Sequence, residues 1–146
     1  MRNELMAITP DKWGLIERLG EGGLLNIEDV KAVVQDLANT RMTVAEEYFE
    51  AAKILLENNI HDRSVISRAY YGMYHAVRAV IYIRARLDVP EHKKLIKKFK
   101  KVLIRESKDY TSSTIVEDWR MRRNWYEYNP LVKPSENLCN QAVEDL

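Results

Sequence analysis

The sequence predicts an all-α protein, an up-and-down bundle of four to six helices. Apolar residues recur at helical spacing along most of the chain, whereas the apolar/polar alternation of a β-strand is sustained nowhere. Residues that cap or break helices, chiefly asparagine, serine, glycine and proline, fall between these periodic segments. The composition, 46% hydrophobic and 31% charged with five glycines and four prolines, is typical of a helix-rich globular protein.

The first two helices are predicted from their end signals. Asp11 can cap a short helix that runs to about Leu19 and ends in a glycine-rich segment. Asn26 can cap a much longer helix, in which apolar residues continue to about Glu57 at alternating steps of four and three. One continuous helix is therefore expected, and a break near Asn39–Thr40 is the alternative.

The limits of the central helix are predicted from a turn before it and from a helix-breaking proline after it. Residues 58–62 predict a tight turn, so the next helix should run antiparallel to the previous one and end near Arg86, ahead of Pro90. A lysine-rich helix should then span about 91–105, with its apolar residues on one side.

The C-terminal helices follow from the same kind of evidence. The hydroxyl residues of segment 111–114 can cap a helix that ends at Asn129. Ser135 then precedes a short last helix.

Length and cysteine content limit the organisation of the chain. With 146 residues it suits a single compact domain, and we expect a helical extension at 1–40 and a bundle at 41–146. The lone cysteine, Cys139, excludes an intramolecular disulfide and is expected to be a small apolar core residue. No segment approaches the roughly 18 apolar residues of a membrane span. A cytoplasmic protein without a membrane partner is therefore expected.

The central helix should present a polar stripe. At about 100° per residue, its polar residues fall in one narrow arc while the other faces are apolar. Buried polar groups are unfavourable unless they are paired, so the stripe predicts either a site between helices or an internal hydrogen-bond network. The stripe consists of Ser64, Ser67, Arg68, Tyr71, His75, Arg78 and Tyr82.

The helix predicted after segment 111–114 places an arginine on its apolar face. Arg123 shares that face with Ile115, Trp119 and Tyr126. It needs a partner there, either a carboxylate or the hydroxyl of Tyr71 if its role is structural, or a groove shared with His75 and Arg78 if its role is functional.

Two segments resemble the HEPN-domain family, in particular its small prokaryotic members. The first is Ser67-Arg-Ala-Tyr-Tyr-Gly-Met-Tyr-His-Ala-Val-Arg-Ala79, and the second is Arg122-Arg-Asn-Trp-Tyr-Glu-Tyr128. The resemblance covers about residues 41–146. It implies a dimerising helical bundle, often encoded beside a small nucleotidyltransferase as a toxin–antitoxin pair, with ribonuclease activity in members that hold an Arg and a His.

The resemblance and the stripe together suggest three functions. The first is a nucleotide- or RNA-binding module of a toxin–antitoxin or nucleotidyltransferase-associated system, with a ribonuclease motif that lacks its histidine. The second is an active metal-independent endoribonuclease, and because no histidine follows Arg123, His75 would have to transfer the proton. The third is a purely structural dimeric interaction protein.

The candidate site residues follow from these functions. Arg123 and His75 are the candidate catalytic residues, whereas other residues are candidates for binding nucleotide or RNA. No cofactor and no metal site are expected, since Gly-rich phosphate loops, HExxH, CxxC and Gly-x-Ser-x-Gly motifs are all absent from the sequence. The expected partners are a second copy of the chain, a small nucleotidyltransferase, and RNA or a nucleotide. The candidate binding residues are Arg68, Tyr71, Arg78, Asn124 and Tyr128.

The lysine-rich helix has two interpretations. Its lysines between 93 and 101 can form a solvated face, or they can contact an RNA backbone, in which case charge reversal at Lys97 and Lys98 should weaken binding. His92, at the start of this helix, is expected to be solvated.

Overall fold

A computed structural model describes residues 10–106 and 110–146, and these residues form six helices and no strand. Helices α2 (Pro10–Glu21) and α3 (Ile27–Glu57) lead into α4 (Arg63–Ala85). Helices α5 (His92–Glu106), α6 (Thr111–Tyr128) and α7 (Glu136–Glu144) complete the chain. The predicted all-α helical bundle is confirmed.

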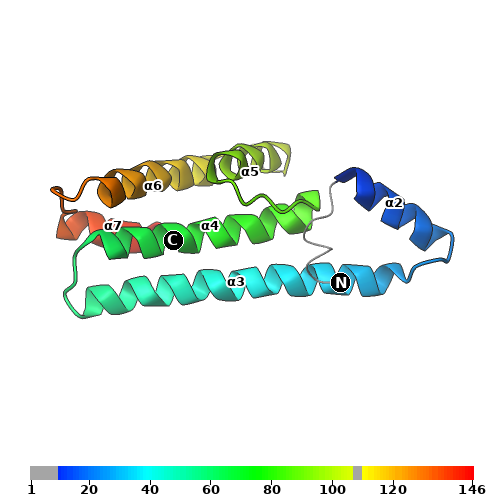
Figure 1. The fold of residues 1–146 in the computed structure, drawn as a ribbon, viewed down its shortest axis with the longest axis horizontal. Coiled ribbons are helices and arrows are strands. Elements are labelled where there is room, and N and C mark those ends of the chain that lie inside the picture. Colours follow the sequence, from blue (N-terminus) through cyan, green and yellow to red (C-terminus); the bar gives the residue numbers. More distant parts are fainter. Residues whose placement is uncertain (1–9, 107–109) are drawn as a thin grey trace.

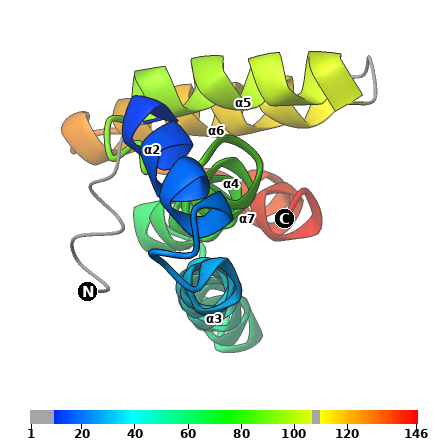
Figure 2. The ribbon, with the colours of Figure 1, turned by 90° about the vertical axis from the view of Figure 1, so that its right-hand side faces the viewer.

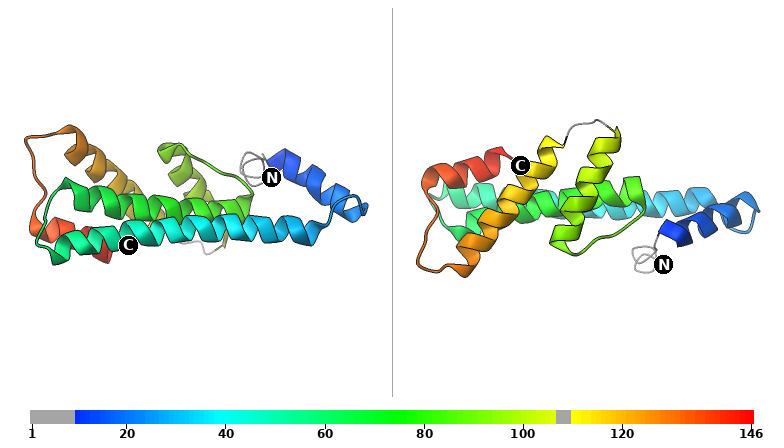
Figure 3. Two further views of the ribbon diagram at one scale, coloured as in Figure 1. Left: turned by 60° about the horizontal axis from the view of Figure 1, so that its bottom comes forward. Right: turned by 90° about the horizontal axis from the view of Figure 1, so that it is seen from above.

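Helix α4 lies at the centre of the bundle and contacts α3, α5, α6 and α7. Figure 1 shows α3 and α4 side by side as a long antiparallel pair. In the end-on view of Figure 2, α5 and α6 form a layer on one side of α4 and α3 lies on the other. Figure 3 shows α5 and α6 crossing α4 obliquely. Residues on all sides of α4 are buried, as expected of a helix enclosed by its neighbours.

Three helix starts show the side-chain caps that fix the ends of the elements. The side-chain oxygen of Asn26 accepts from the backbone N–H of Glu28 at 3.1 Å, as predicted for the start of α3. Asp62 caps α4 and Ser135 caps α7 in the same way. Helix α3 is continuous across residues 39 and 40, so the alternative of a break at Asn39–Thr40 is wrong.

Two predicted helix starts are wrong in detail. Helix α6 begins after Tyr110, which makes no side-chain cap, and the hydroxyl residues of segment 111–114 lie inside its first turn. There the hydroxyl of Ser113 donates to the carbonyl of Tyr110 at 2.7 Å, since a first-turn hydroxyl can reach back to the preceding backbone. Helix α2 begins at Pro10, one residue before the expected cap Asp11, because proline suits the first helical position.

The N-terminal extension packs onto the bundle through a second apolar cluster. Trp13 of α2 is buried with Val34 and Leu37 of α3 and with Tyr82 of α4. The proposed division at residue 40 falls within the continuous helix α3 and stays a prediction, and residues 1–9 lie outside the described residues.

None of the helices in the described part of the chain has both the length and the apolar character needed to cross a membrane.

Candidate functional site

An open groove of about 380 Å³ lies where the N-terminal half of α4 meets α3 and α6. We call it the arginine groove, because arginines from two helices line it. Helical spacing places its α4 residues on one face of that helix, and all of them except Arg63 belong to the predicted polar stripe. The groove is lined by Tyr48 from α3, by Arg63, Ser64, Ser67, Arg68 and Tyr71 from the start of α4, and by Arg123 and Glu127 from α6.

Arg123 links α6 to the centre of the groove. Its Nη2 donates to the hydroxyl oxygen of Tyr71 at 3.0 Å, and its Nη1 donates to the side-chain oxygen of Asn124 at 3.1 Å. The guanidinium carbon lies 5.2 Å from the centroid of the Tyr71 ring, within range of a cation–π interaction. Tyr71 was one of the two partners expected for Arg123, and this contact is confirmed. Arg123 therefore has a neutral partner and also lines an open groove.

The other groove residues add positive charge and aromatic surface. Arg68 lies with its guanidinium carbon 5.7 Å from the centroid of the Tyr48 ring, and Tyr48 stacks on Tyr71 with centroids 5.5 Å apart. Arg63 donates from Nη2 to the backbone carbonyl of Pro130 at 3.1 Å.

One carboxylate faces these arginines in the groove. Glu127 accepts a hydrogen bond from the hydroxyl of Ser67 at 2.8 Å. Within residues 10–106 and 110–146, none of the three groove arginines forms an ion pair. Three arginines against one glutamate leave the groove with a net positive charge, which suits an anionic ligand.

His75 does not line the groove. Its ring stacks on Tyr48 with centroids 5.5 Å apart and meets Tyr74 edge-on at 5.2 Å. Its Nδ1 is buried without a hydrogen-bond partner among the described residues. Burial, followed by the positive charges of Arg78 and Arg41, lowers the pKa of His75 below its usual value. The structure therefore favours a neutral imidazole one aromatic ring away from the arginines.

The far half of the polar stripe is buried in an ion-pair network. Arg78 donates from Nε and Nη2 to the carboxylate of Asp88, at 3.0 and 2.7 Å, and Arg41 of α3 donates to the same carboxylate at 2.6 Å. Tyr82 is 1% exposed, and its hydroxyl has no partner within the described residues. Tyr128 is 77% exposed and lies outside the lining of the groove.

The predicted site residues are thus only partly brought together. Arg68, Tyr71 and Arg123 line one groove, and Asn124 is hydrogen-bonded to Arg123. His75, Arg78 and Tyr128 lie elsewhere.

His92 is a residue whose role the sequence analysis missed. The expectation that it is solvated is wrong, because its Nδ1 lies 2.5 Å from the hydroxyl oxygen of Tyr70 and its ring stacks on Tyr74 at 4.4 Å. Burial, then the nearby positive charges of Arg123 and Arg120, lower the pKa of His92. The spacing of Tyr70 and Tyr74 on one helix face was a signal that could have indicated an aromatic surface for a neighbour.

Tyr48, Glu127 and Arg63 were also missed as groove residues, and Arg63 directly precedes the predicted stripe. Tyr48 belongs to the apolar repeat of α3, where a tyrosine suggests core packing, and Glu127 belongs to the second segment of the family resemblance without having been given a binding role. The only sequence signal for Tyr48 was its position in the apolar repeat, and the only signal for Glu127 was its position in the family motif.

Cys139 and metal ligation play no part in the groove. Cys139 is fully buried, its Sγ lies 3.8 Å from the carbonyl oxygen of Asp62, and burial raises the pKa of the thiol to about 11. In the part of the chain that the structure describes, no three histidine, cysteine, aspartate or glutamate residues are grouped so that they could hold a metal ion.

Comparison with known proteins agrees with this architecture. The model of the HEPN domain matches residues 38–129. A protein of Methanocaldococcus jannaschii named "Putative toxin MJ0605" is 30% identical over 122 residues, which is 82% of this chain and 84% of that protein. UPF0332 protein PH1297 of Pyrococcus horikoshii is 35% identical over 66 residues, 45% of each chain. No solved structure matches the chain significantly. The match to the family model spans more than half of the sequence, and the chain belongs to the HEPN domain family.

Proposed function

We propose that this protein is an RNA-binding HEPN module of a toxin–antitoxin system, and that its arginine groove is the RNA-binding site. The observation that carries the proposal is the convergence of three arginines without ion pairs, within the described residues, on one groove with two tyrosine rings. The name of the archaeal relative, which describes a toxin, supports the biological setting.

The chemistry of the groove suits single-stranded RNA. Guanidinium groups form bidentate hydrogen bonds to phosphate oxygens, and in the described residues those of Arg68 and Arg123 are bonded to no carboxylate. Unpaired bases stack on aromatic rings, and the stacked Tyr48 and Tyr71 rings offer such a platform. A nucleotide would use the same two features, so it is the smallest ligand that the groove should bind.

Binding rather than cleavage is the function that the geometry favours. A ribonuclease built on His75 and Arg123 needs both groups at the scissile phosphate, but His75 is packed between Tyr48 and Tyr74 and does not line the groove. A purely structural role does not account for the arginines that face an open groove. The paired-system partner, a small nucleotidyltransferase, is part of the proposal and rests on the family resemblance.

The test compares Arg123→Ala with Arg122→Ala in the full chain. Arg122 is a matched control, because it is the neighbouring arginine of α6, packs on the ring of Trp119 and does not line the groove. Thermal unfolding and binding to a labelled single-stranded RNA should be measured on the same samples.

The expected result is selective. Arg123→Ala should weaken RNA binding by about tenfold or more, the loss of one charge-assisted contact, with a melting temperature close to that of the wild type. Arg122→Ala should bind like the wild type. A large loss of stability in Arg123→Ala, with RNA binding intact in the folded fraction, would instead assign Arg123 to the structural interpretation.

A further inference from the structure

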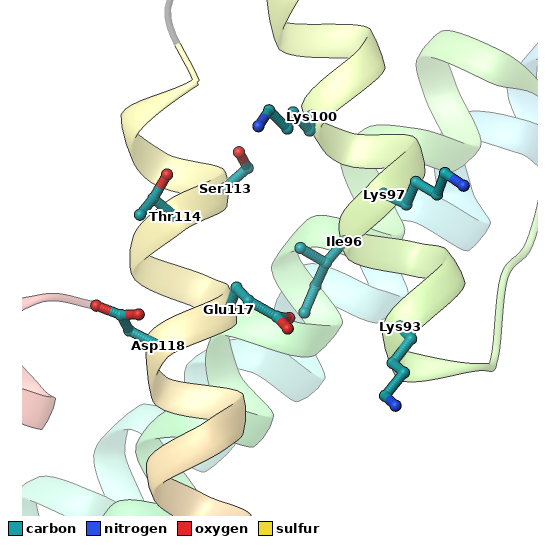
Figure 4. A pocket seen from close by; sticks show the side chains of 8 residues that line it. All are labelled: Lys93, Ile96, Lys97, Lys100, Ser113, Thr114, Glu117 and Asp118. Atoms are coloured by element: carbon teal, nitrogen blue, oxygen red, sulfur yellow. The ribbon is translucent and has the colours of Figure 1, made fainter.

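Five of the six lysines of α5 are divided between two grooves with different electrostatic character. Figure 4 shows the first groove, of about 390 Å³, which is lined by Lys93, Lys97 and Lys100 of α5 and by residues of α6. The second groove, of about 330 Å³, lies between the C-terminal ends of α4 and α5, and we call it the terminal groove. The terminal groove is lined by Arg84 and Ala85 of α4 and by Lys98, Lys101, Val102, Arg105 and Glu106 of α5.

The first groove is close to electrically balanced. Glu117 of α6 points toward α5, whereas the carboxylate of Asp118 points away from it (Figure 4). Lys100 also lies 4.6 Å from the centroid of the Tyr110 ring. The charges of three lysines and two carboxylates in the lining of the first groove therefore nearly cancel.

The terminal groove has a strong excess of positive charge. It has four cationic side chains and one carboxylate, that of Glu106, which pairs with Arg84 at 3.5 Å. Lys98, Lys101 and Arg105 form no ion pair within residues 10–106 and 110–146. Cations in the last turn of a helix interact favourably with its dipole, which accounts for Arg84 and Arg105. Lys98 and Lys101 lie before that turn, so the dipole does not account for them.

We infer that the terminal groove is a second RNA-binding surface, which contacts the phosphodiester backbone and not the bases. This inference rests on the proposed function and extends it. Its lining has no aromatic residue on which a base could stack, and the apolar residues Ala85 and Val102 are small. Lysine and arginine side chains without local partners are the groups that neutralise phosphates and release counterions.

The two grooves would contact different parts of one RNA, because they lie far apart along α4. Arg68 and Arg84 are separated by sixteen residues of α4, about 24 Å along the helix axis, and they point to nearly opposite sides of it. At the stacked spacing of about 3.4 Å per nucleotide, roughly seven nucleotides of stacked RNA cover this distance, and more are needed to pass around the helix. A very short RNA should therefore use the arginine groove alone.

The experiment exploits two matched pairs of lysines on the same helix. Lys98→Ala/Lys101→Ala removes two charges from the terminal groove, and Lys97→Ala/Lys100→Ala removes two charges with the same spacing from the first groove. Binding of the full chain to single-stranded RNAs of about 4 and about 20 nucleotides, of several sequences, should be measured over a salt series. A thermal melt of each variant confirms that it is folded.

The terminal-groove variant should bind the long RNA more weakly, and equally so for every sequence. The slope of log affinity against log salt should fall in magnitude by about 1.4, because each lost phosphate contact on a single strand contributes about 0.7. The control pair should retain the wild-type slope. An unchanged slope in the terminal-groove variant, or an equal loss in both pairs, would overturn the inference.

The short RNA separates this inference from the proposed function. Its affinity reports on the arginine groove, so it should fall in Arg123→Ala and stay unchanged in both lysine pairs. If the Lys98→Ala/Lys101→Ala variant binds the long RNA like the wild type, while Arg123→Ala still weakens binding of the short RNA, only the terminal-groove inference is refuted. Absence of any effect of Arg123→Ala on the short RNA would refute the proposed function, whatever the lysine variants do.

Discussion

Replacing Asp88 with alanine should destabilise the protein by about 4 kcal/mol without affecting the arginine groove. Asp88 lies in the connection between α4 and α5, and its carboxylate accepts three hydrogen bonds, one from Arg41 and two from Arg78. All three side chains are only 12–13% exposed. The network therefore joins α3, α4 and the connection at the end of α4 that is distant from the arginine groove.

The size of the expected stability loss follows from the burial of the Asp88 ion-pair network. Removing one partner of a buried ion pair is typically destabilising by about 3–5 kcal/mol, because the remaining charge stays desolvated. Here two guanidinium groups lose one shared carboxylate, and a charge-assisted hydrogen bond contributes about 1.5–3 kcal/mol. The sum over three bonds is an upper bound, since the carboxylate itself no longer has to be desolvated. For a domain of about 150 residues, 4 kcal/mol corresponds to a fall of roughly 8–16 °C in melting temperature.

Urea denaturation and thermal melts measure the effect, and two further variants locate its source. Asp88→Asn keeps hydrogen-bond acceptance without the charge and should lie between Asp88→Ala and the wild type. Arg78→Met should lower the free energy of unfolding less in the Asp88→Ala background than in the wild type, because the two residues form one network. A free energy of unfolding for Asp88→Ala within about 1 kcal/mol of the wild type would refute the reasoning.

Further predictions concern pH and assembly. Burial lowers the pKa of His75 and His92 below the ordinary value of 6.5, so the unfolded chain binds more protons in the interval just below that value, and stability should fall as pH decreases from about 7 to 5. Thermal melts at several pH values measure this fall, and His92→Asn should reduce it; a variant with the full wild-type pH dependence would contradict the role of His92. The chain should also form a homodimer, because Met121, Trp125 and Tyr128 leave an exposed apolar stripe on α6. Light scattering at several concentrations would contradict the dimer if it showed only a monomer.

The sequence was sufficient to predict the helices because their boundaries depend on local chemistry. Asn26 and Ser135 cap helices through hydrogen bonds to residues two or three positions away, so the pattern of the sequence contains the relevant contact. The same holds for the turn after α3. The errors at the start of α6 arose because a serine or threonine can bond either as a cap or back to the preceding carbonyl, and the sequence does not distinguish the two.

The candidate site was harder to predict, since its contacts join distant segments. Helical periodicity placed Arg68, Tyr71 and Arg78 on one stripe, but it gives direction around the helix and not the partner at each level. Asp88 binds Arg78 only because the chain after α4 folds back along it. The sequence does not reveal the contact of His92, because its partner, Tyr70, lies on another helix.

The sequence also does not show which groove each lysine of the lysine-rich helix lines. Lys97 and Lys98 are adjacent in sequence and were treated as one charged face, yet they line different grooves. Only the neighbouring helices decide that Lys97 lines a groove with two carboxylates and Lys98 lines a groove with two arginines. A charge reversal at both positions would therefore mix two distinct surfaces.

Ultraviolet cross-linking of the protein to single-stranded RNA, followed by mass spectrometry of the cross-linked peptides, tests the central claim most directly. If the arginine groove binds RNA by stacking and phosphate contacts, cross-links should form at Tyr48 and Tyr71 and should be strongly reduced in folded Arg123→Ala. Tyr110 is an exposed aromatic residue outside the groove and serves as an internal control. Cross-links that form at Tyr110 but not at Tyr48 or Tyr71, with a pattern that Arg123→Ala leaves unchanged, would contradict the account.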